Sequence, residues 1–180
     1  MTYDGKDVTG LLQPSPAASG SSNIAIPQPP AGGYPAGSSH TMTINDTCGF
    51  FCVYPTITMT FTPPTLSIFA PSPSQNAPVV GSIAVPTQAT FVDLAVPAGP
   101  GGTTVTLTAN PPIVNFKATP TDPGSTSFPL TIGAGQIEGS FYVQAIPGQT
   151  VGTPFTVTGT ASGFQVGTQS GSIQQHSPGG

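Results

Sequence analysis

After residue 55 the sequence changes to a pattern in which polar and apolar residues alternate, and this period of two constrains the fold most. The first segment is Thr56–Phe61, TITMTF, and Pro63 and Pro64 follow it. Successive side chains of a β-strand point to opposite faces, so this pattern predicts strands with one buried face. Nine further segments follow, each closed by Pro or Gly, at residues 66–70, 79–85, 90–96, 103–109, 113–116, 128–132, 139–146, 155–161 and 164–173.

The alternation also names the inward faces of these strands. They are Val105, Leu107 and Ala109; Phe128, Leu130 and Ile132; Phe141, Val143 and Ala145; and Phe155, Val157 and Gly159. The residues between them are mostly Thr, Ser and Gln, and no window shows a sustained helical period. Short alternating strands at this spacing predict an all-β fold, a β-sandwich of roughly seven to nine strands.

Glycine and proline are unusually frequent, with 23 of each among 180 residues. That fraction approaches the level of low-complexity chains. The hydrophobic fraction of 36% argues against disorder, because disordered chains are usually highly charged and poor in apolar residues. We therefore interpret Gly and Pro as turn residues between short strands.

Residues 1–55 show no sustained period, and we interpret them as a long, extended, Pro/Gly-rich N-terminal arm. Pro27–Ser39, PQPPAGGYPAGSS, is its extreme case. Brief apolar pieces interrupt the arm, each too short for a core but able to bind in a groove of another subunit. The expected partner-binding residues are Leu11, Leu12, Ile24, Ile26, Tyr34, Phe50, Phe51 and Tyr54. The expected domains are this arm, a sandwich at 56–175 and a C-terminal tail at 176–180.

Charge is nearly absent from the chain, which has two lysines, six acids and no arginine. Proteins that bind nucleic acid or anionic lipid rely on Lys and Arg, so we expect neither nucleic acid nor membrane as a partner. No run approaches the roughly 18 apolar residues of a membrane span. The first ten residues, MTYDGKDVTG, lack the apolar region of a secretory signal. We expect a soluble protein made in a cytoplasm.

Two cysteines, Cys48 and Cys52, flank the short segment GFF. Their C-x3-C spacing matches neither zinc ribbons nor thioredoxin-like motifs, and both histidines are poorly placed as further ligands. We expect two small buried side chains, with a local disulfide as the alternative, and no metal site.

No arrangement in the sequence indicates catalysis or a cofactor. Gly133-Ala134-Gly135 precedes a strand-like segment, not the helix that a phosphate-binding loop needs, and predicts a turn. Asp93, Asp122 and Glu138 are far apart in the sequence for a pair of catalytic carboxylates. We expect no enzyme and no cofactor, and we interpret the three acids as surface residues.

Three segments resemble the bacterial and phage immunoglobulin-like (Ig-like) domains of virion decoration and surface proteins: TTVTLTANPPIVNF, FPLTIGAGQIEGSFYVQA and PFTVTGTASGF. Such domains commonly have a V-x-L strand before a proline-ended loop, here Val105 and Leu107. An I-x-A-G hairpin with an F-x-V strand follows, here from Ile132 to Val143. The resemblance covers about residues 66–174 and implies an Ig-like β-sandwich that serves as a spacer, an adhesin or a decoration.

An uncharged sandwich has exposed strand edges to protect, which monomeric β-proteins do with Lys, inward charges or bulges. Segments such as PFTVTGTA carry no charge, so we expect the arm or another subunit to cover an edge, with TITMTF as the best candidate for a donated strand.

These features favour a structural protein, a viral (phage) capsid decoration or cement protein. We expect it to bind and stabilise an assembled shell through its arm and Ig-like domain. The expected partners are the major capsid protein or copies of the chain itself, as a homo-oligomer or in lattice contacts. Its expected location is the virion surface, after synthesis in the host cytoplasm.

Two alternatives stay open at this point. An extracellular filament or adhesin subunit assembled by β-strand donation would have the same uncharged strands. A carbohydrate-binding Ig-like module would use exposed aromatic side chains.

Overall fold

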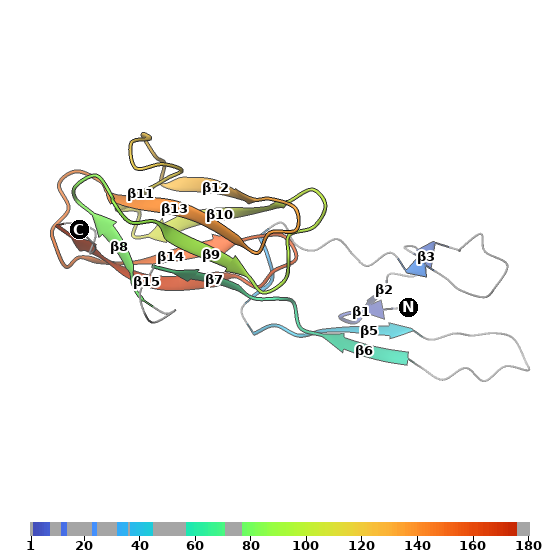
Figure 1. The fold of residues 1–180 in the computed structure, drawn as a ribbon. Helices are drawn as coiled ribbons and strands as arrows, with labels where there is room; N and C mark the ends of the chain where they lie inside the picture. Colours follow the sequence, from blue (N-terminus) through green and yellow to red (C-terminus); the bar gives the residue numbers. More distant parts are fainter. Residues whose placement is uncertain are drawn as a thin grey trace, which may run out of the picture. The chain divides into compact units, whose positions relative to one another are not determined.

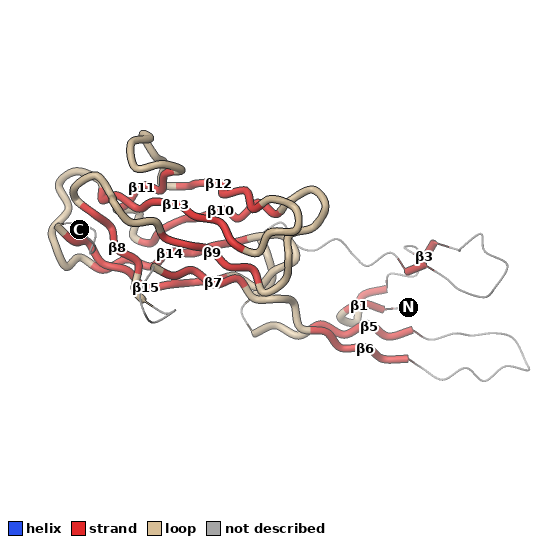
Figure 2. The backbone as a smooth tube through the Cα atoms, viewed as in Figure 1, coloured by secondary structure: helices blue, strands red, loops and turns tan. Residues whose placement is uncertain are grey.

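The computed structural model describes residues 2–7, 12–13, 23–24, 32–35, 37–44, 57–70 and 77–175 of the chain. All regular structure in these residues is β-strand, which confirms the predicted all-β class (Figure 2). The described residues accordingly contain no helix long and apolar enough to cross a lipid bilayer. The chain divides into two units: unit 1 is Met1–Pro29 with Gly37–Pro63, and unit 2 is Pro30–Ala36 with Pro64–Gly180.

Unit 1 contains a four-stranded antiparallel sheet in the order β2-β1-β5-β6. Its strands are β1 (Thr2–Tyr3), β2 (Lys6–Asp7), β5 (His40–Ile44) and β6 (Ile57–Phe61). A separate antiparallel pair consists of β3 (Leu12–Gln13) and β4 (Asn23–Ile24).

This sheet corrects two expectations. An extended arm does not describe residues 2–7 and 40–44, because both segments are paired in the sheet. The strand predicted at 56–61 is present as β6, but it pairs with β5 in unit 1 and does not begin the sandwich. The boundary between the units lies between Pro63 and Pro64, eight residues beyond the expected end of the arm.

The turn between β1 and β2 explains how such short strands form. Asp4 and Gly5 have φ angles of 49° and 77°, the left-handed values that a two-residue type I′ hairpin turn requires. Asp-Gly is a preferred pair for this turn, because both residues tolerate positive φ. The dipeptide is therefore the local sequence signal for this hairpin.

The described residues of unit 2 form nine strands. They are β7 (Leu66–Phe69), β8 (Val79–Ser82), β9 (Thr90–Leu94), β10 (Thr103–Asn110), β11 (Val114–Lys117), β12 (Ser127–Ile132), β13 (Glu138–Ala145), β14 (Pro154–Thr160) and β15 (Gly167–Gln174). Each of the nine segments predicted after residue 65 is confirmed as a strand, with ends that differ by at most three residues.

The strands of unit 2 form one hydrogen-bonded path that folds back on itself (Figure 1). The order is β12-β10-β14-β15-β8-β13-β9-β7, with β11 paired to β13, and β7 packs against β14 and β15. Neighbours are antiparallel except at β8, which pairs in parallel with β15 and β13. Two layers result, β12-β10-β14-β15-β8 and β7-β9-β13-β11, an arrangement consistent with the expected β-sandwich.

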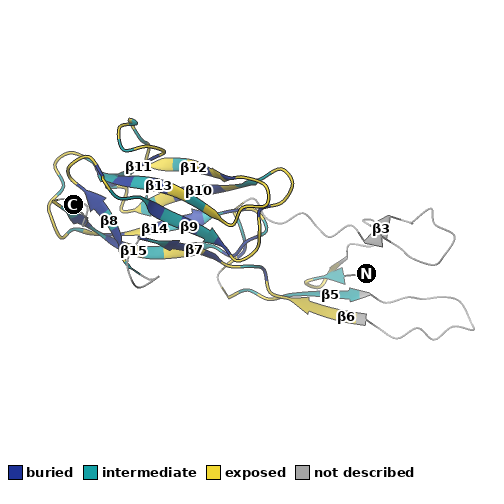
Figure 3. Ribbon diagram, in the orientation of Figure 1, coloured by how far each residue is buried: buried dark blue, intermediate teal, exposed yellow. Residues whose placement is uncertain are grey.

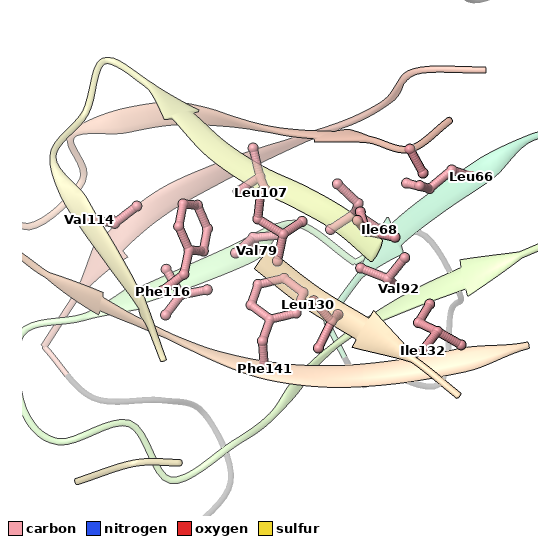
Figure 4. Close-up of a cluster of buried hydrophobic side chains, with 14 of the residues drawn as sticks. Leu66, Ile68, Val79, Val92, Leu107, Val114, Phe116, Leu130, Ile132 and Phe141 are labelled. Atoms are coloured by element: carbon pink, nitrogen blue, oxygen red, sulfur yellow. The ribbon is translucent and has the colours of Figure 1, made fainter. Parts of the chain in front are cut away.

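Both layers direct apolar side chains into one core (Figure 4). Leu107 from one layer and Phe141 from the other are inaccessible to solvent, and the Phe141 ring meets Phe116 edge-on at 5.8 Å between centroids. Burial of each such side chain contributes about 1.5–3 kcal/mol. The expected inward faces are confirmed, with Ala109 and Phe128 only partly buried against the core.

The sandwich protects its own edges. The segment PFTVTGTA, expected to need cover, corresponds to β14, which is a central strand between β10 and β15. The outermost strand β12 contains Pro129, a residue that edge strands tolerate and that discourages pairing with a further strand. The outer strand β11 ends in a charged residue, Lys117. The outer strand β7 packs closely against β15, because the Leu66 carbonyl lies so near Gly167 that a Cβ atom would not fit there. The lack of charge in β14 therefore reflects its central position.

Candidate functional site

The β5–β6 hairpin pairs two nearly identical sequences. Thr41–Thr43 runs antiparallel to Thr58–Thr60, with Met42 directly opposite Met59. Threonine therefore meets threonine on one face of the sheet, and methionine meets methionine on the other. The repeat is visible in the sequence as HTMTI and ITMTF, but only the register reveals that the two copies bind each other.

One face of the unit 1 sheet is apolar and aromatic. The rings of Tyr3, His40 and Phe61 lie 5.6–6.1 Å from one another, centroid to centroid, and the first two are parallel. Met42, in the central strand β5, is 5% exposed, whereas Met59 in β6 is 47% exposed. Burial on this face thus decreases toward the β6 edge.

Asp4 connects the first turn to β5. Its Oδ2 lies 2.6 Å from Nδ1 of His40, and its Oδ1 accepts a hydrogen bond from the Thr41 N–H at 2.8 Å. The Asp4 N–H donates to the Thr41 carbonyl at 2.9 Å. The hydrogen bond with His40, followed by that from the Thr41 N–H, lowers the pKa of the Asp4 carboxyl below its ordinary value. These contacts hold β1 and β2 on the side of the sheet remote from β6.

β6 is the outer strand of this sheet and lacks the protection found in unit 2. Within the described ranges it pairs only with β5. All of Thr58–Phe61 is exposed, as the yellow arrow in Figure 3 shows, and the strand contains no charged residue and no Pro. The unpaired N–H and C=O groups of such an edge can accept another strand. The β6 edge is therefore the candidate functional site, an interaction surface and not a pocket.

Part of the Pro/Gly-rich stretch binds within unit 2. The Tyr34 N–H donates to the Phe164 carbonyl at 2.6 Å, and the Tyr34 carbonyl accepts from the Val166 N–H at 2.8 Å. These bonds make a parallel bridge to Gln165. Residues 32–35 of this stretch are thus part of the sandwich unit and bind to it through Tyr34, whereas Gly37–Ser39 belong to unit 1.

Gly33 allows this close approach. Its φ is +77°, and a Cβ atom at this position would lie 2.8 Å from the Phe164 carbonyl oxygen. Only glycine fits both constraints without strain. Tyr34 is 5% exposed, and its expected role in binding another subunit stays a prediction.

Of the other expected partner-binding residues, the structure describes only Leu12 and Ile24. Leu12 and Ile24 lie opposite each other in the β3–β4 pair. Outside the described residues lie Leu11, Ile26, Phe50, Phe51 and Tyr54, together with Cys48 and Cys52. Their binding role and the possible disulfide stay predictions.

The register also brings together two acids that are distant in the sequence. Glu138 in β13 lies directly opposite Asp93 in β9. Burial raises the pKa of Asp93 above its ordinary value, and Asp93 Oδ1 is buried without a hydrogen-bond partner. Asp122 lies elsewhere and accepts a hydrogen bond from the Thr119 N–H at 2.8 Å. No group of three or more His, Cys, Asp or Glu side chains gathers as a metal site in the described part of the chain.

A pocket of about 490 Å³ lies beside β8, β11 and β13. Its lining includes Ile83, Asn115, Gln144 and Gln149, and none of its lining residues is titratable. Amide and aliphatic side chains of this kind provide hydrogen bonds and apolar contact, but no acid, base or nucleophile. The pocket therefore gives no basis for a catalytic proposal.

Comparison of the chain with protein-family models, with curated proteins and with solved structures found no match.

Proposed function

We propose that the chain is a structural protein whose sandwich is Ig-like. Constant-type Ig domains pair strands A-B-E-D in one sheet and C-F-G in the other. Taken in chain order as A to G, strands β7, β9, β10, β11, β13, β14 and β15 give the same pairings, β7-β9-β13-β11 and β10-β14-β15. β8 and β12 are additions to this plan. The agreement in strand order supports the family that the sequence motifs resemble.

The function that these features support best is decoration of a viral (phage) capsid. One observation carries the proposal: β6 is an exposed, uncharged edge strand in a chain whose sandwich protects its own edges. An isolated soluble protein benefits from charge at such an edge, whereas a subunit of an assembly uses the open edge to bind. Unit 1 then attaches the protein and unit 2 supplies a rigid domain on the shell surface.

The partner is the major capsid protein or further copies of the chain. With two lysines and six acids in 180 residues, electrostatic attraction contributes little to binding. Backbone pairing and apolar contact supply the affinity, because neither depends strongly on ionic strength.

The test uses the full chain and undecorated shells assembled from the major capsid protein of the phage that encodes it. We expect the chain to sediment with the shells at a fixed stoichiometry, and to stay bound when NaCl rises from about 0.05 M to about 0.5 M. Chain that stays in the supernatant, or that salt releases, would contradict the proposal. Fibres formed by the chain alone, with no binding to shells, would instead identify the filament subunit.

A further inference from the structure

We propose that the β6 edge binds the β6 strand of a second copy of this chain, in an antiparallel pair centred on Met59. The inference rests on the proposed function, because it names the partner of the same edge. It makes the chain a symmetric dimer, in which the same surface of each copy forms the interface.

The sequence of β6 complements itself in this register. Met59 meets Met59 of the second copy, and Thr58 meets Thr60 of the second copy. The Thr face and the face that carries Met59 therefore both continue across the pair. A slip by one residue would place threonine opposite methionine and mix the faces, so the side-chain pattern specifies this register.

The chain already makes such a pair internally. In the β5–β6 hairpin, Thr41–Thr43 binds Thr58–Thr60 antiparallel with methionines opposite each other at the centre. The intermolecular pair repeats this ladder with a second β6 in the place of β5. The order β2-β1-β5-β6 then continues as β6-β5-β1-β2 of the second copy, and the four-stranded sheet doubles.

Exposure and charge in unit 1 fit the same interface. The exposed large apolar side chains described in unit 1 are Met59 and Phe61, at 47% and 37%, and both belong to β6. The charged residues Lys6 and Asp7 lie in β2, on the far side of the sheet. Two copies that meet along β6 therefore cover apolar surface without bringing like charges together.

The interface is short, so its affinity in solution is modest. A five-residue strand pair forms few cross-strand contacts, and we expect a dissociation constant on the order of 0.1 mM. Copies that are held side by side on a shell have a high effective concentration, so the same pair becomes nearly fully formed there.

The first test uses charge pairs in the full chain, followed by sedimentation equilibrium at low salt. Thr58→Lys/Thr60→Lys places like charges opposite each other twice in the dimer, whereas Thr58→Lys/Thr60→Glu places opposite charges there. Positions 58 and 60 face threonines of β5 in the hairpin, so the two variants perturb the monomer similarly. We expect the first variant to weaken dimerisation by at least about tenfold relative to the second.

A mixing experiment covers the case in which the Lys/Lys variant merely loses its hairpin. When the Lys/Lys variant is mixed with the Thr58→Glu/Thr60→Glu variant, we expect the two chains to form a mixed dimer, which native mass spectrometry detects. Equal association of the Lys/Lys and Lys/Glu variants would overturn the inference. So would a chain that is monomeric at millimolar concentration, or the absence of mixed dimers.

A cross-linking test reads the register directly, in a chain with Cys48→Ser and Cys52→Ser. Met59→Cys is expected to give a disulfide-linked dimer on mild oxidation, because residue 59 meets itself. Phe61→Cys is the matched control, since the two copies of residue 61 would lie four positions apart, about 13 Å along the strands. Equal cross-linking of the two variants would contradict the register.

The outcomes separate this inference from the proposed function. A chain that dimerises through β6 but does not bind shells supports the dimer and refutes capsid decoration. A chain that binds shells equally well as the Lys/Lys and Lys/Glu variants supports decoration and refutes the β6 pair.

Discussion

The strands β6 and β14 carry the same kind of sequence and have opposite places in their sheets. Both alternate threonine with apolar residues and contain no charge. β14 lies between β10 and β15 in unit 2, whereas β6 is the outer strand of unit 1. The alternation determines that each segment is a strand, and the neighbours determine whether the strand belongs to a core or to an interface.

The aromatic side chains of the two units differ in the same way. Phe141 is fully enclosed between the layers of the sandwich, while Phe61 is 37% exposed at the open edge of the unit 1 sheet. We therefore expect unit 2 to be stable by its own packing and unit 1 to gain most when its edge is covered.

The largest expected effect is a loss of stability when the core of unit 2 is changed. Phe141→Ala should lower the free energy of unfolding by about 3–5 kcal/mol, because it removes a fully buried ring and leaves a cavity. Phe61→Ala is the matched variant and should cost less than about 1 kcal/mol in dilute solution, where its ring stays partly solvated. Urea unfolding followed by circular dichroism measures both. Equal losses of unfolding free energy in the two variants would contradict the proposed difference between the two units.

The next effect concerns the attachment of Tyr34 to unit 2. Gly33→Ala should destabilise this attachment by about 1–3 kcal/mol, because alanine disfavours a φ of +77° and its Cβ would contact the Phe164 carbonyl. Hydrogen exchange of the Val166 amide, which donates to Tyr34, should then accelerate. Gly32→Ala is the control, since a Cβ there meets nothing within 4 Å. The same acceleration in the control would show that the close approach at residue 33 is not the cause.

A smaller effect is expected at Asp93 in unit 2. Burial raises the pKa of Asp93 in the folded state, so its contribution to stability is present below the ordinary value of 3.8 and is lost as pH rises through the raised pKa. Asp93→Asn should therefore stabilise the sandwich at pH 7, by less than about 1 kcal/mol because solvent partly screens the site. Thermal melts at pH 7 and pH 3 test the sign. If Asp93→Asn raised the melting temperature as much at pH 3 as at pH 7, this result would contradict the burial argument.

The smallest effect is expected at Asp4 in unit 1, in the opposite direction. Its folded-state pKa is lowered, so the ionised carboxyl stabilises the β1–β5 pairing above the ordinary value of 3.8, and this contribution is lost as pH falls through the lowered pKa. NMR titration of the Thr41 amide, which donates to Asp4, should show this loss. Asp4→Asn should abolish the acid transition at Thr41, and an unchanged transition in that variant would assign it to another group.

The strands of unit 2 could be predicted because their period of two is local. Val105 and Leu107 in β10, for example, point inward as the alternation requires, and both are fully buried. TITMTF was predicted correctly as a strand and assigned wrongly to the sandwich, because its pattern is the same as that of β14. Only pairing with β5, across residues 45–56, places it in unit 1.

Other features depend on contacts that no local pattern contains. β1 and β2 have two residues each, too few for any period, and only the Asp4-Gly5 turn marks them in the sequence. Tyr34 was recognisable as an anchoring side chain, but its binding site at Phe164–Val166 is set by the fold of unit 2. The open β6 edge likewise follows from strand order.

The most direct measurement of the central claim is backbone hydrogen exchange of β6 at increasing protein concentration. If β6 is an open edge that a second copy covers, those backbone amides of Thr58–Phe61 that point away from β5 should exchange fast in dilute solution and more slowly as concentration rises. The amides of β14 should be slow throughout, because both of its edges are already paired. Exchange of these outward-pointing amides that is independent of concentration, or as slow as that of β14 in the dilute chain, would contradict the account.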